Sequence, residues 1–290
     1  MLIFVGLVLI VAWCIAMIDT VGALFGQWSV VGDGRHLVFG FEITTLMLLL
    51  FVSVMIRRWV YLQSDSKKLR KIANFSLASL SLCMVGDVIN FNLREQFYRH
   101  GEIIKHDYLA DSVWFFAPGY ILLIMAVFSA INHFEALSRK KTQESVIHSH
   151  SGLYHIGHHF KLYILAIVAI VVGGSAFMSM YLPETGLYIS VLTALHSIVI
   201  TAVAVSAMMM IYSVGVKNMS TGLWCVVCGL LLAALADAII GQYWIYGAQG
   251  EGFFPQVRYI NWAVYITSQC FVILLPYYVV QHTKKAINTV

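Results

Sequence analysis

Eight long apolar stretches divide the chain, and short polar segments separate them. We expect each stretch to form a membrane-spanning helix, because a helix needs roughly 20 apolar residues to cross the hydrocarbon core and satisfies its own backbone hydrogen bonds there. The stretches are too long and too uniformly apolar for the alternating strands of a membrane barrel. The expected spans are Leu2–Ala23, Leu37–Ile56, Ile72–Asn92, Leu109–Ile131, Leu162–Tyr181, Leu187–Tyr212, Leu223–Tyr243 and Val257–Val280.

Composition supports an all-α polytopic membrane protein. Hydrophobic residues make up 60% of the chain and charged residues 11%, whereas soluble domains carry about 25% charged residues. The longest connections, Asn132–Lys161 and Leu93–Tyr108, are too short to bury a core of their own. We therefore expect residues 1–290 to form a single integral membrane domain. The net charge of +4 is too small to indicate nucleic-acid binding.

The basic residues are distributed unequally between the two sets of loops. With eight spans, thirteen of the eighteen Lys and Arg residues fall on the side that carries both termini. Because positive residues collect on cytoplasmic loops, both termini are expected to be cytoplasmic, and we expect a bacterial inner (cytoplasmic) membrane protein. The first span lacks a basic region before it and an A-x-A site, so we do not expect a cleaved signal peptide.

The sequence contains a weak internal repeat. Val85-Gly86-Asp87-Val88-Ile89 in the third span resembles Leu235-Ala236-Asp237-Ala238-Ile239 in the seventh, at an offset of 150 residues. Trp114 and Trp262 align in the following spans at an offset of 148. A nearly constant offset favours a parallel repeat of four helices plus four, although chance similarity between apolar helices is the alternative.

Carboxylates inside the expected spans are the strongest functional signal, because ionisable groups within a membrane are costly to bury. Asp19, Glu42, Asp87, Asp111 and Asp237 all fall in the outer halves of their spans. At about 1.5 Å of rise per residue, Asp87 and Asp237 lie roughly 8 to 9 Å from the outer helix ends. Asp19 and Asp111 lie near helix ends, where a structural role is favoured, and Glu42 could pair with a neighbouring helix.

We expect a polar pocket open to the outer leaflet. Asp87 and Asp237 are the candidate catalytic residues, because burial and mutual proximity favour one protonated and one ionised carboxyl group. That combination serves general acid–base hydrolysis, and no G-x-S-x-G motif indicates serine chemistry. The candidate substrate-binding residues are Glu42, Asn90, Asp111, His196, Asn261 and Gln269.

These residues resemble the YhhN-like lysoplasmalogenase family of eight-helix membrane proteins. The resemblance rests on Gly86-Asp87, on Ala236-Asp237 and on Tyr265-Ile266-Thr267-Ser268-Gln269, which looks like an aromatic-x-x-x-Gln stretch of that family. The sequence departs from the family at Ala236, where a Ser is usual, and at Ala117-Pro118, where an Ala-His pair is frequent. The resemblance implies cleavage of the vinyl-ether bond of lysoplasmalogen, with no metal or other cofactor.

Two other functions use the same outer pocket. One is a non-catalytic ligand-binding or sensory module, and the other is a carboxylate-based ion- or proton-coupled transporter. In each case the expected partner is a lipid or an amphipathic small molecule, not a nucleic acid. The histidines between His148 and His159 are interpreted as a solvated interfacial loop, with metal binding as the alternative. Aromatic residues near the span ends, among them Trp28, Tyr246 and Trp262, are expected to anchor at the membrane interface.

Overall fold

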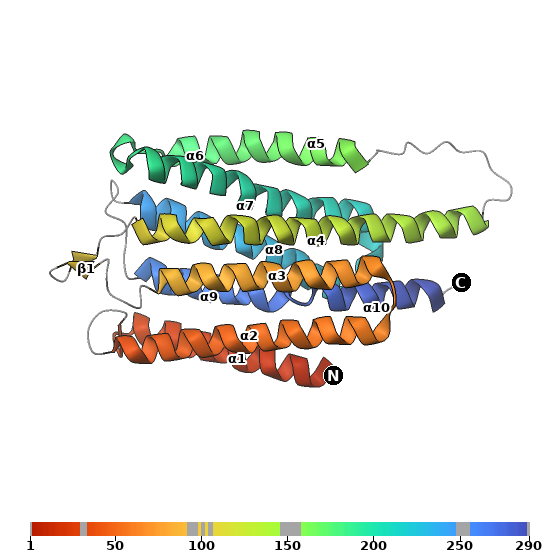
Figure 1. The fold of residues 1–290 in the computed structure, drawn as a ribbon, viewed down its shortest axis with the longest axis horizontal. Helices are drawn as coiled ribbons and strands as arrows, with labels where there is room; N and C mark the ends of the chain where they lie inside the picture. Colours follow the sequence, from red (N-terminus) through yellow and green to blue (C-terminus); the bar gives the residue numbers. More distant parts are fainter. Residues whose placement is uncertain are drawn as a thin grey trace.

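The computed structural model describes residues 2–29, 34–91, 98–99, 102–103, 107–145, 158–247 and 256–288, and these are almost entirely helical (Figure 1). The helices are α1 (Leu2–Leu24), α2 (Arg35–Gln63), α3 (Lys67–Asn90), α4 (Asp107–Ser145), α5 (His158–Val168), α6 (Gly174–Met180), α7 (Leu187–Val214), α8 (Thr221–Ile239), α9 (Gln256–Val272) and α10 (Leu275–Asn288). Shorter elements are the π-helical segments η1 (Ala169–Gly173) and η4 (Ile240–Ile245), the 3-10 turns η2 (Pro183–Thr185) and η3 (Val216–Asn218), and the antiparallel strands β1 (Tyr98–Arg99) and β2 (Glu102–Ile103).

The prediction of eight spans is confirmed. Within the described residues, eight helices are long and apolar enough to cross a membrane. They comprise Ile3–Leu24, Arg35–Gln63, Lys67–Asn90, Asp111–Ser138, Phe160–Met180, Leu187–Val214, Thr221–Tyr243 and Gln256–Ala286. Several extend beyond the expected limits, because hydropathy detects only the part of a helix that contacts lipid. The helix of α4, for example, continues to Ser145, well past Ile131.

Three spans contain interruptions that the apolar pattern does not indicate. In the seventh span, α8 passes directly into the π-helical segment η4. The fifth span consists of α5, the π-helical segment η1 and α6 in continuous succession. The eighth span is divided at Ile273 and Leu274 into α9 and α10. The cause of the break in the eighth span is Pro276. Proline has no backbone N–H to donate to the carbonyl oxygen of Val272, and its ring would clash with that carbonyl group.

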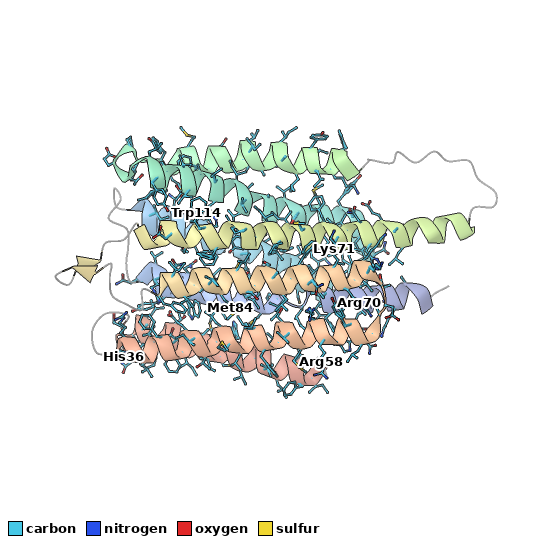
Figure 2. The ribbon with its side chains drawn as sticks, viewed as in Figure 1. His36, Arg58, Arg70, Lys71, Met84 and Trp114 are labelled. Carbon is cyan, nitrogen blue, oxygen red and sulfur yellow. The ribbon has the colours of Figure 1, made fainter. Side chains whose placement is uncertain are left out.

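The helices form one bundle, and at its edge the fifth span (α5, η1 and α6) and α7 form a peripheral hairpin. Packing joins α3 with α4, α8 with α9, α4 with α7, and α1 with both α2 and α9, while α5, η1 and α6 pack against α7 (Figure 1). Both ends of the chain lie at the same end of the bundle, and Figure 2 shows Arg58, Arg70 and Lys71 toward that end. Apolar side chains such as Ile167 and Val171 in the peripheral hairpin are exposed, as expected for surfaces that contact lipid.

Small residues allow α3 and α4 to approach closely. A Cβ atom at Gly86 would lie 2.8 Å from the ring of Phe116, and a Cβ atom at Gly119 would lie 2.8 Å from Cys83 Sγ. Membrane helices associate by such close packing because apolar burial alone gives no advantage over lipid. The contact places Asp87, which follows Gly86, beside the aromatic face of α4.

Candidate functional site

Three of the predicted carboxylates meet in a small cavity near the outer end of the bundle, as the sequence orients it. The cavity has a volume of about 40 Å³. Glu42 comes from α2, Asp87 from α3 and Asp237 from α8. Its lining also includes Asn90, Phe91, Phe116, Ile240, Arg258, Asn261, Trp262 and Tyr265. Residues far apart in the sequence therefore contribute to one acidic, aromatic pocket.

A much larger cavity of about 550 Å³ adjoins it and shares Asn90, Phe116, Asp237 and Ile240 with the small one. Most of its lining is apolar and comes from α4, α6, α7, α8 and η4. The volume lies in the range of small-molecule sites, about 300–1,000 Å³. The exposed side chains of Val172, Leu235 and Tyr243 line it, so the cavity opens sideways toward the lipid-facing surface of the bundle.

Both π-helical segments contribute to the wall of the large cavity. Val172 comes from η1, and Gly241 and Gln242 come from η4. A π turn inserts an additional residue into a helix, rotates the following side chains, and occurs frequently at functional sites. In η1 the backbone lies directly against α7, where Ser197 Oγ donates a hydrogen bond of 2.8 Å to the carbonyl oxygen of Gly173.

Asp87 is held in an aromatic environment. Its side chain is buried, and Oδ2 accepts a hydrogen bond of 2.9 Å from the hydroxyl of Tyr265 on α9. The Tyr265 ring lies edge-on to Phe116 at 6.2 Å and 6.1 Å from the Trp262 ring. These rings exclude water from one side of the carboxyl group and fix its orientation.

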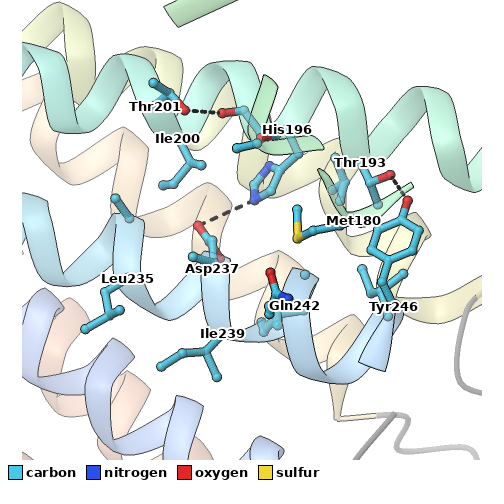
Figure 3. Close-up of a pocket in the computed structure, with 18 of the residues that line it drawn as sticks. Met180, Thr193, His196, Ile200, Thr201, Leu235, Asp237, Ile239, Gln242 and Tyr246 are labelled. Carbon is cyan, nitrogen blue, oxygen red and sulfur yellow. Dashed lines mark hydrogen bonds and ion pairs between the residues drawn. The ribbon is translucent and has the colours of Figure 1, made fainter. Parts of the chain in front are cut away.

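Asp237 faces the opposite wall and pairs with His196 on α7. His196 Nε2 lies 3.4 Å from Asp237 Oδ2, and Figure 3 shows the two side chains directed toward each other. The imidazole is also 5.8 Å from the ring of Tyr120. Because Asp237 lines both cavities, it is the carboxylate best placed to contact a molecule in the larger one.

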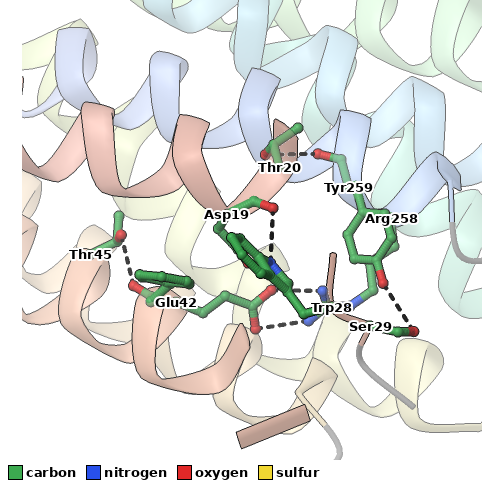
Figure 4. A network of polar contacts seen from close by, with 9 residues as sticks. Asp19, Thr20, Trp28, Ser29, Glu42, Thr45, Arg258 and Tyr259 are labelled. Atoms are coloured by element: carbon green, nitrogen blue, oxygen red, sulfur yellow. Dashed lines mark hydrogen bonds and ion pairs between the residues drawn. The ribbon is translucent and has the colours of Figure 1, made fainter. Parts of the chain in front are cut away.

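Glu42 has an ionic partner on another helix, which was one of the two roles that the sequence left open for it. Arg258 Nη2 donates a hydrogen bond of 2.8 Å to Glu42 Oε2, and Nη1 lies 2.7 Å from Oε1 (Figure 4). The pair therefore combines one charge-assisted hydrogen bond with a second close approach of the charged groups. The sequence groups Arg258 with the outer basic residues, whereas the structure buries it in α9.

Asp19 belongs to the same polar network. Its side chain is buried, and Oδ1 accepts a hydrogen bond of 3.1 Å from Trp28 Nε1 (Figure 4). Trp28 packs so tightly on α1 that a Cβ atom at Gly22 would lie 2.0 Å from its ring.

The prediction of interfacial anchoring is wrong for Trp262 and Tyr246, which are only 6% and 7% exposed.

Two predicted substrate-binding residues lie apart from the cavities. Asp111 Oδ1 accepts a hydrogen bond of 3.0 Å from the Tyr188 hydroxyl, which itself accepts one from Trp114 Nε1. Gln269 is buried deeper in α9. Neither is among the described residues that line the two cavities, and the arrangement at Asp111 fits the structural role favoured for it.

Several polar atoms at the small cavity are available to a ligand. Asn90 Oδ1, Asn261 Oδ1 and Trp262 Nε1 are buried and have no hydrogen-bond partner within the part of the chain that the structure describes. Buried polar atoms in proteins are nearly always paired. Two acceptors and one donor on the cavity wall thus suit a polar group with both kinds of partner.

At the outer rim, beyond the span that ends at Tyr243, Tyr246 lines the large cavity. Its hydroxyl lies 2.6 Å from Thr193 Oγ1 (Figure 3). Burial raises the pKa of Tyr246 above its ordinary value. The phenol is therefore neutral at physiological pH and acts as a hydrogen-bonding side chain at the rim.

The described residues contain no group of three or more His, Cys, Asp or Glu side chains suited to a metal ion. The histidine-rich segment from His148 lies outside the described residues up to residue 157.

The fold and its buried polar centre define a polytopic α-helical membrane protein with an intramembrane acidic pocket. No protein-family model, curated protein or solved structure matched the chain in comparisons.

Proposed function

We propose that the protein is a membrane-embedded hydrolase that cleaves the vinyl-ether bond of a lysoplasmalogen-type lipid, with Asp87 and Asp237 as the catalytic pair. The observation that carries the proposal is their position. Both carboxyl groups line the small cavity, and Asp237 also lines the apolar cavity of about 550 Å³. The resemblance to the YhhN-like family in the windows around Asp87 and Asp237 supports the same assignment.

The two cavities suit an amphipathic substrate. An alkyl chain would enter the large apolar cavity sideways from the lipid, and the ether oxygen would lie at its junction with the small cavity. Because the chain comes from lipid that is as apolar as the cavity, its affinity depends on how closely it fits the cavity wall. The polar atoms of Asn90 and Asn261 would then orient the group beside the ether bond.

The chemistry needs one protonated and one ionised carboxyl group. The protonated one donates its proton to the vinyl carbon that is not bonded to oxygen, and the double-bond electrons form the new C–H bond. The ionised one stabilises the resulting oxocarbenium ion and accepts a proton from the attacking water. The hemiacetal then breaks its C–O bond, a proton passes to the leaving oxygen, and an aldehyde and a glycerophospho head group are released.

The experiment is an aldehyde-release assay on the purified protein with lysoplasmalogen and with the corresponding alkyl-ether lysolipid. We expect aldehyde from the vinyl ether alone. Asp87→Asn and Asp237→Asn should each lower the rate by about 10²–10⁴-fold, the usual contribution of an acid–base group. Asp111→Asn is the matched control and should retain activity. Unchanged turnover in both cavity variants would refute the site.

A ligand-binding or sensory module is the second candidate, because the unpartnered polar atoms at the small cavity favour capture of a polar group whether or not it reacts. Saturable lysolipid binding that both aspartate variants weaken, without aldehyde release, would support it. Gradient-driven flux in proteoliposomes would instead support a transporter. We also infer, from the distribution of Lys and Arg, that both termini face the cytoplasm.

A further inference from the structure

Two helices direct polar side chains toward the small cavity. On α3, Asp87 and Asn90 are three residues apart, and on α9, Asn261 and Trp262 precede Tyr265 by four and three residues. Residues at these spacings lie on the same side of a helix. All five line the cavity, and the hydrogen bond from Tyr265 to Asp87 joins the two helices there.

Three polar atoms of this wall have no hydrogen-bond partner within the described parts of the chain. They are Asn90 Oδ1, Asn261 Oδ1 and Trp262 Nε1. The amide oxygens accept hydrogen bonds, whereas the indole nitrogen only donates. A buried water typically makes about three hydrogen bonds, and it can donate two of them and accept the third. The three atoms therefore provide the partners of one water molecule.

The size and polarity of the small cavity also suit water. One water molecule takes up roughly 30 Å³ in the liquid, and the cavity measures about 40 Å³. A lipid chain needs the neighbouring cavity of about 550 Å³. Cavities that stay dry are lined by apolar groups, whereas carboxyl, amide and indole groups contribute to this wall.

Trp262 holds its N–H group in a fixed direction. The residue is only 6% exposed, and its ring lies 6.0 Å from that of Phe91 and 6.1 Å from that of Tyr265. The Tyr265 hydroxyl in turn donates to Asp87. One aromatic cluster thus fixes both the indole donor and a carboxyl group, so a water bound to Trp262 is oriented before a substrate arrives.

We propose that the small cavity holds the water molecule that attacks the substrate, and that Trp262 is a positioning residue for it. The inference rests on the proposed hydrolase function. Asp87 and Asp237 both line the small cavity, so the ionised member of the pair reaches the water. The ether bond lies at the junction with the large cavity in the proposed complex, and its oxygen-bearing vinyl carbon faces the water. A nucleophile held in place lowers the entropic part of the barrier.

The attack balances in atoms and electrons. Once the protonated carboxyl group has transferred its proton to the other vinyl carbon, a lone pair of the water oxygen forms a bond to the oxygen-bearing carbon. The π electrons of the oxocarbenium ion return to the ether oxygen, and one water proton passes to the ionised carboxylate. A hemiacetal results. The amide N–H groups of Asn90 and Asn261 serve the substrate group beside the ether bond, while their oxygens accept from the water.

The water site is tested without substrate, by hydroxyl-radical labelling of the purified protein with an X-ray pulse, which converts a bound water into a radical that oxidises adjacent side chains. We expect oxidation of Trp262 and Phe91, although they are only 6% and 3% exposed. Phe128 is similarly buried but does not line the cavity, and it should stay unmodified. No oxidation of Trp262 or Phe91 would overturn the proposal, whether or not the protein is active.

Trp262→Phe removes the indole donor and should abolish the oxidation of Phe91. Trp13→Phe is the matched control, because the Trp13 indole donates to Thr267 instead, and it should leave the oxidation of Phe91 unchanged. Equal losses in both variants would overturn the role of Trp262.

The same label distinguishes water from a hydroxyl group of the substrate. We expect Phe91 to remain oxidised when the alkyl-ether lysolipid is bound, because an attacking water must be present beside the substrate. Loss of the label on lipid binding would overturn the proposal, since the small cavity would then receive a hydroxyl group of the lipid.

The catalytic role is tested by the hydrolysis of lysoplasmalogen in the presence of methanol. The parent protein should release aldehyde only, because the attacking molecule is the bound water. Asn261→Ala widens the small cavity and should also give a mixed acetal, formed when methanol attacks in place of water. Trp262→Phe should lower kcat about tenfold with KM unchanged, because the nucleophile loses one hydrogen bond, and Trp13→Phe should change neither.

The outcomes separate this inference from the proposed function. Aldehyde release by a parent protein that also forms the acetal in proportion to methanol would overturn the water site and leave the hydrolase intact. An unchanged kcat in Trp262→Phe would do the same. No aldehyde from the parent protein would refute the proposed function, and the catalytic role of the water would be lost with it.

Discussion

Replacement of Glu42 by Gln tests whether the Glu42–Arg258 pair holds α2 against α9. The Glu42 side chain is fully buried and that of Arg258 is 10% exposed. The two contacts of 2.8 and 2.7 Å leave little room for water between the charged groups. Removal of one partner therefore leaves the other charge buried with less compensation.

The expected cost follows from the charges around Arg258. Two unit charges about 4 Å apart attract by about 4 kcal/mol at an effective dielectric constant of about 20, and breaking a buried pair costs about 3–5 kcal/mol. Asp19 and Asp87 also interact electrostatically with Arg258. In Glu42→Gln these carboxylates still compensate the guanidinium, so we expect a loss of about 3 kcal/mol. Arg258→Met strands all three acids, and we expect about 5 kcal/mol.

The assay is reversible unfolding in mixed micelles, followed by tryptophan fluorescence. The double variant Glu42→Leu/Arg258→Met should be no less stable than Arg258→Met alone. Once Arg258 is gone, Glu42 has no buried cation to pair with, so its removal causes no further loss. Asp65→Asn breaks the exposed Arg70–Asp65 pair and should cost no more than about 1 kcal/mol. Additive losses in the double variant would refute the reasoning. So would a Glu42→Gln protein that is fully stable yet inactive, because Glu42 would then be catalytic.

Two further predictions concern the cavities. Tyr265→Phe removes the hydroxyl that donates a hydrogen bond to Asp87. Because a hydrogen bond to a charged group contributes about 1.5–3 kcal/mol, the rate of aldehyde release should fall by at least about tenfold. An unchanged rate would show that Asp87 does not need this donor. Ala176→Trp narrows the large cavity at an exposed lining position. The indole occupies space that the alkyl chain needs, and a loss of about 1.4 kcal/mol of packing would raise KM about tenfold. Ser175→Trp, also exposed and on the same helix but not among the lining residues, should leave KM unchanged.

The membrane helices could be predicted from sequence because their length and apolar character are set by the bilayer. The π-helical segments could not, since hydropathy sees the same apolar run whether a turn holds 3.6 residues or more. The neighbouring glycines Gly173, Gly174 and Gly241 are the available signal, but glycine is frequent in membrane helices generally. The break before Pro276 was open to prediction, because proline disrupts the preceding turn.

Helix rise from the outer span ends predicts Glu42, Asp87 and Asp237 at one depth, and the structure brings them to one cavity. Depth carries no information about rotation around each helix axis, so it does not tell which polar residues face the cavity, and the expected binding roles of Asp111 and Gln269 rest only on their being polar residues within spans. The sequence groups Arg258 with the outer basic residues because it lies one residue after the start of the expected span at Val257. A long side chain can reach inward from a helix end, and buried acids at the same depth were the signal that a buried cation should be sought.

The partners of the acids indicate where a ligand can act. Both oxygens of Glu42 face Arg258, so its charge is already matched within the protein. Among the ion pairs of the described residues, Asp237 pairs only with His196, and it borders the open apolar cavity. The unpartnered atoms of Asn90, Asn261 and Trp262 lie beside it in the small cavity. Each such atom costs about 1–3 kcal/mol of stability, and proteins retain local costs of this kind mainly at functional sites. The ionic network of α1, α2 and α9 therefore holds these helices together, and the proposed reaction is favoured where Asp87 on α3 and Asp237 on α8 face the cavity.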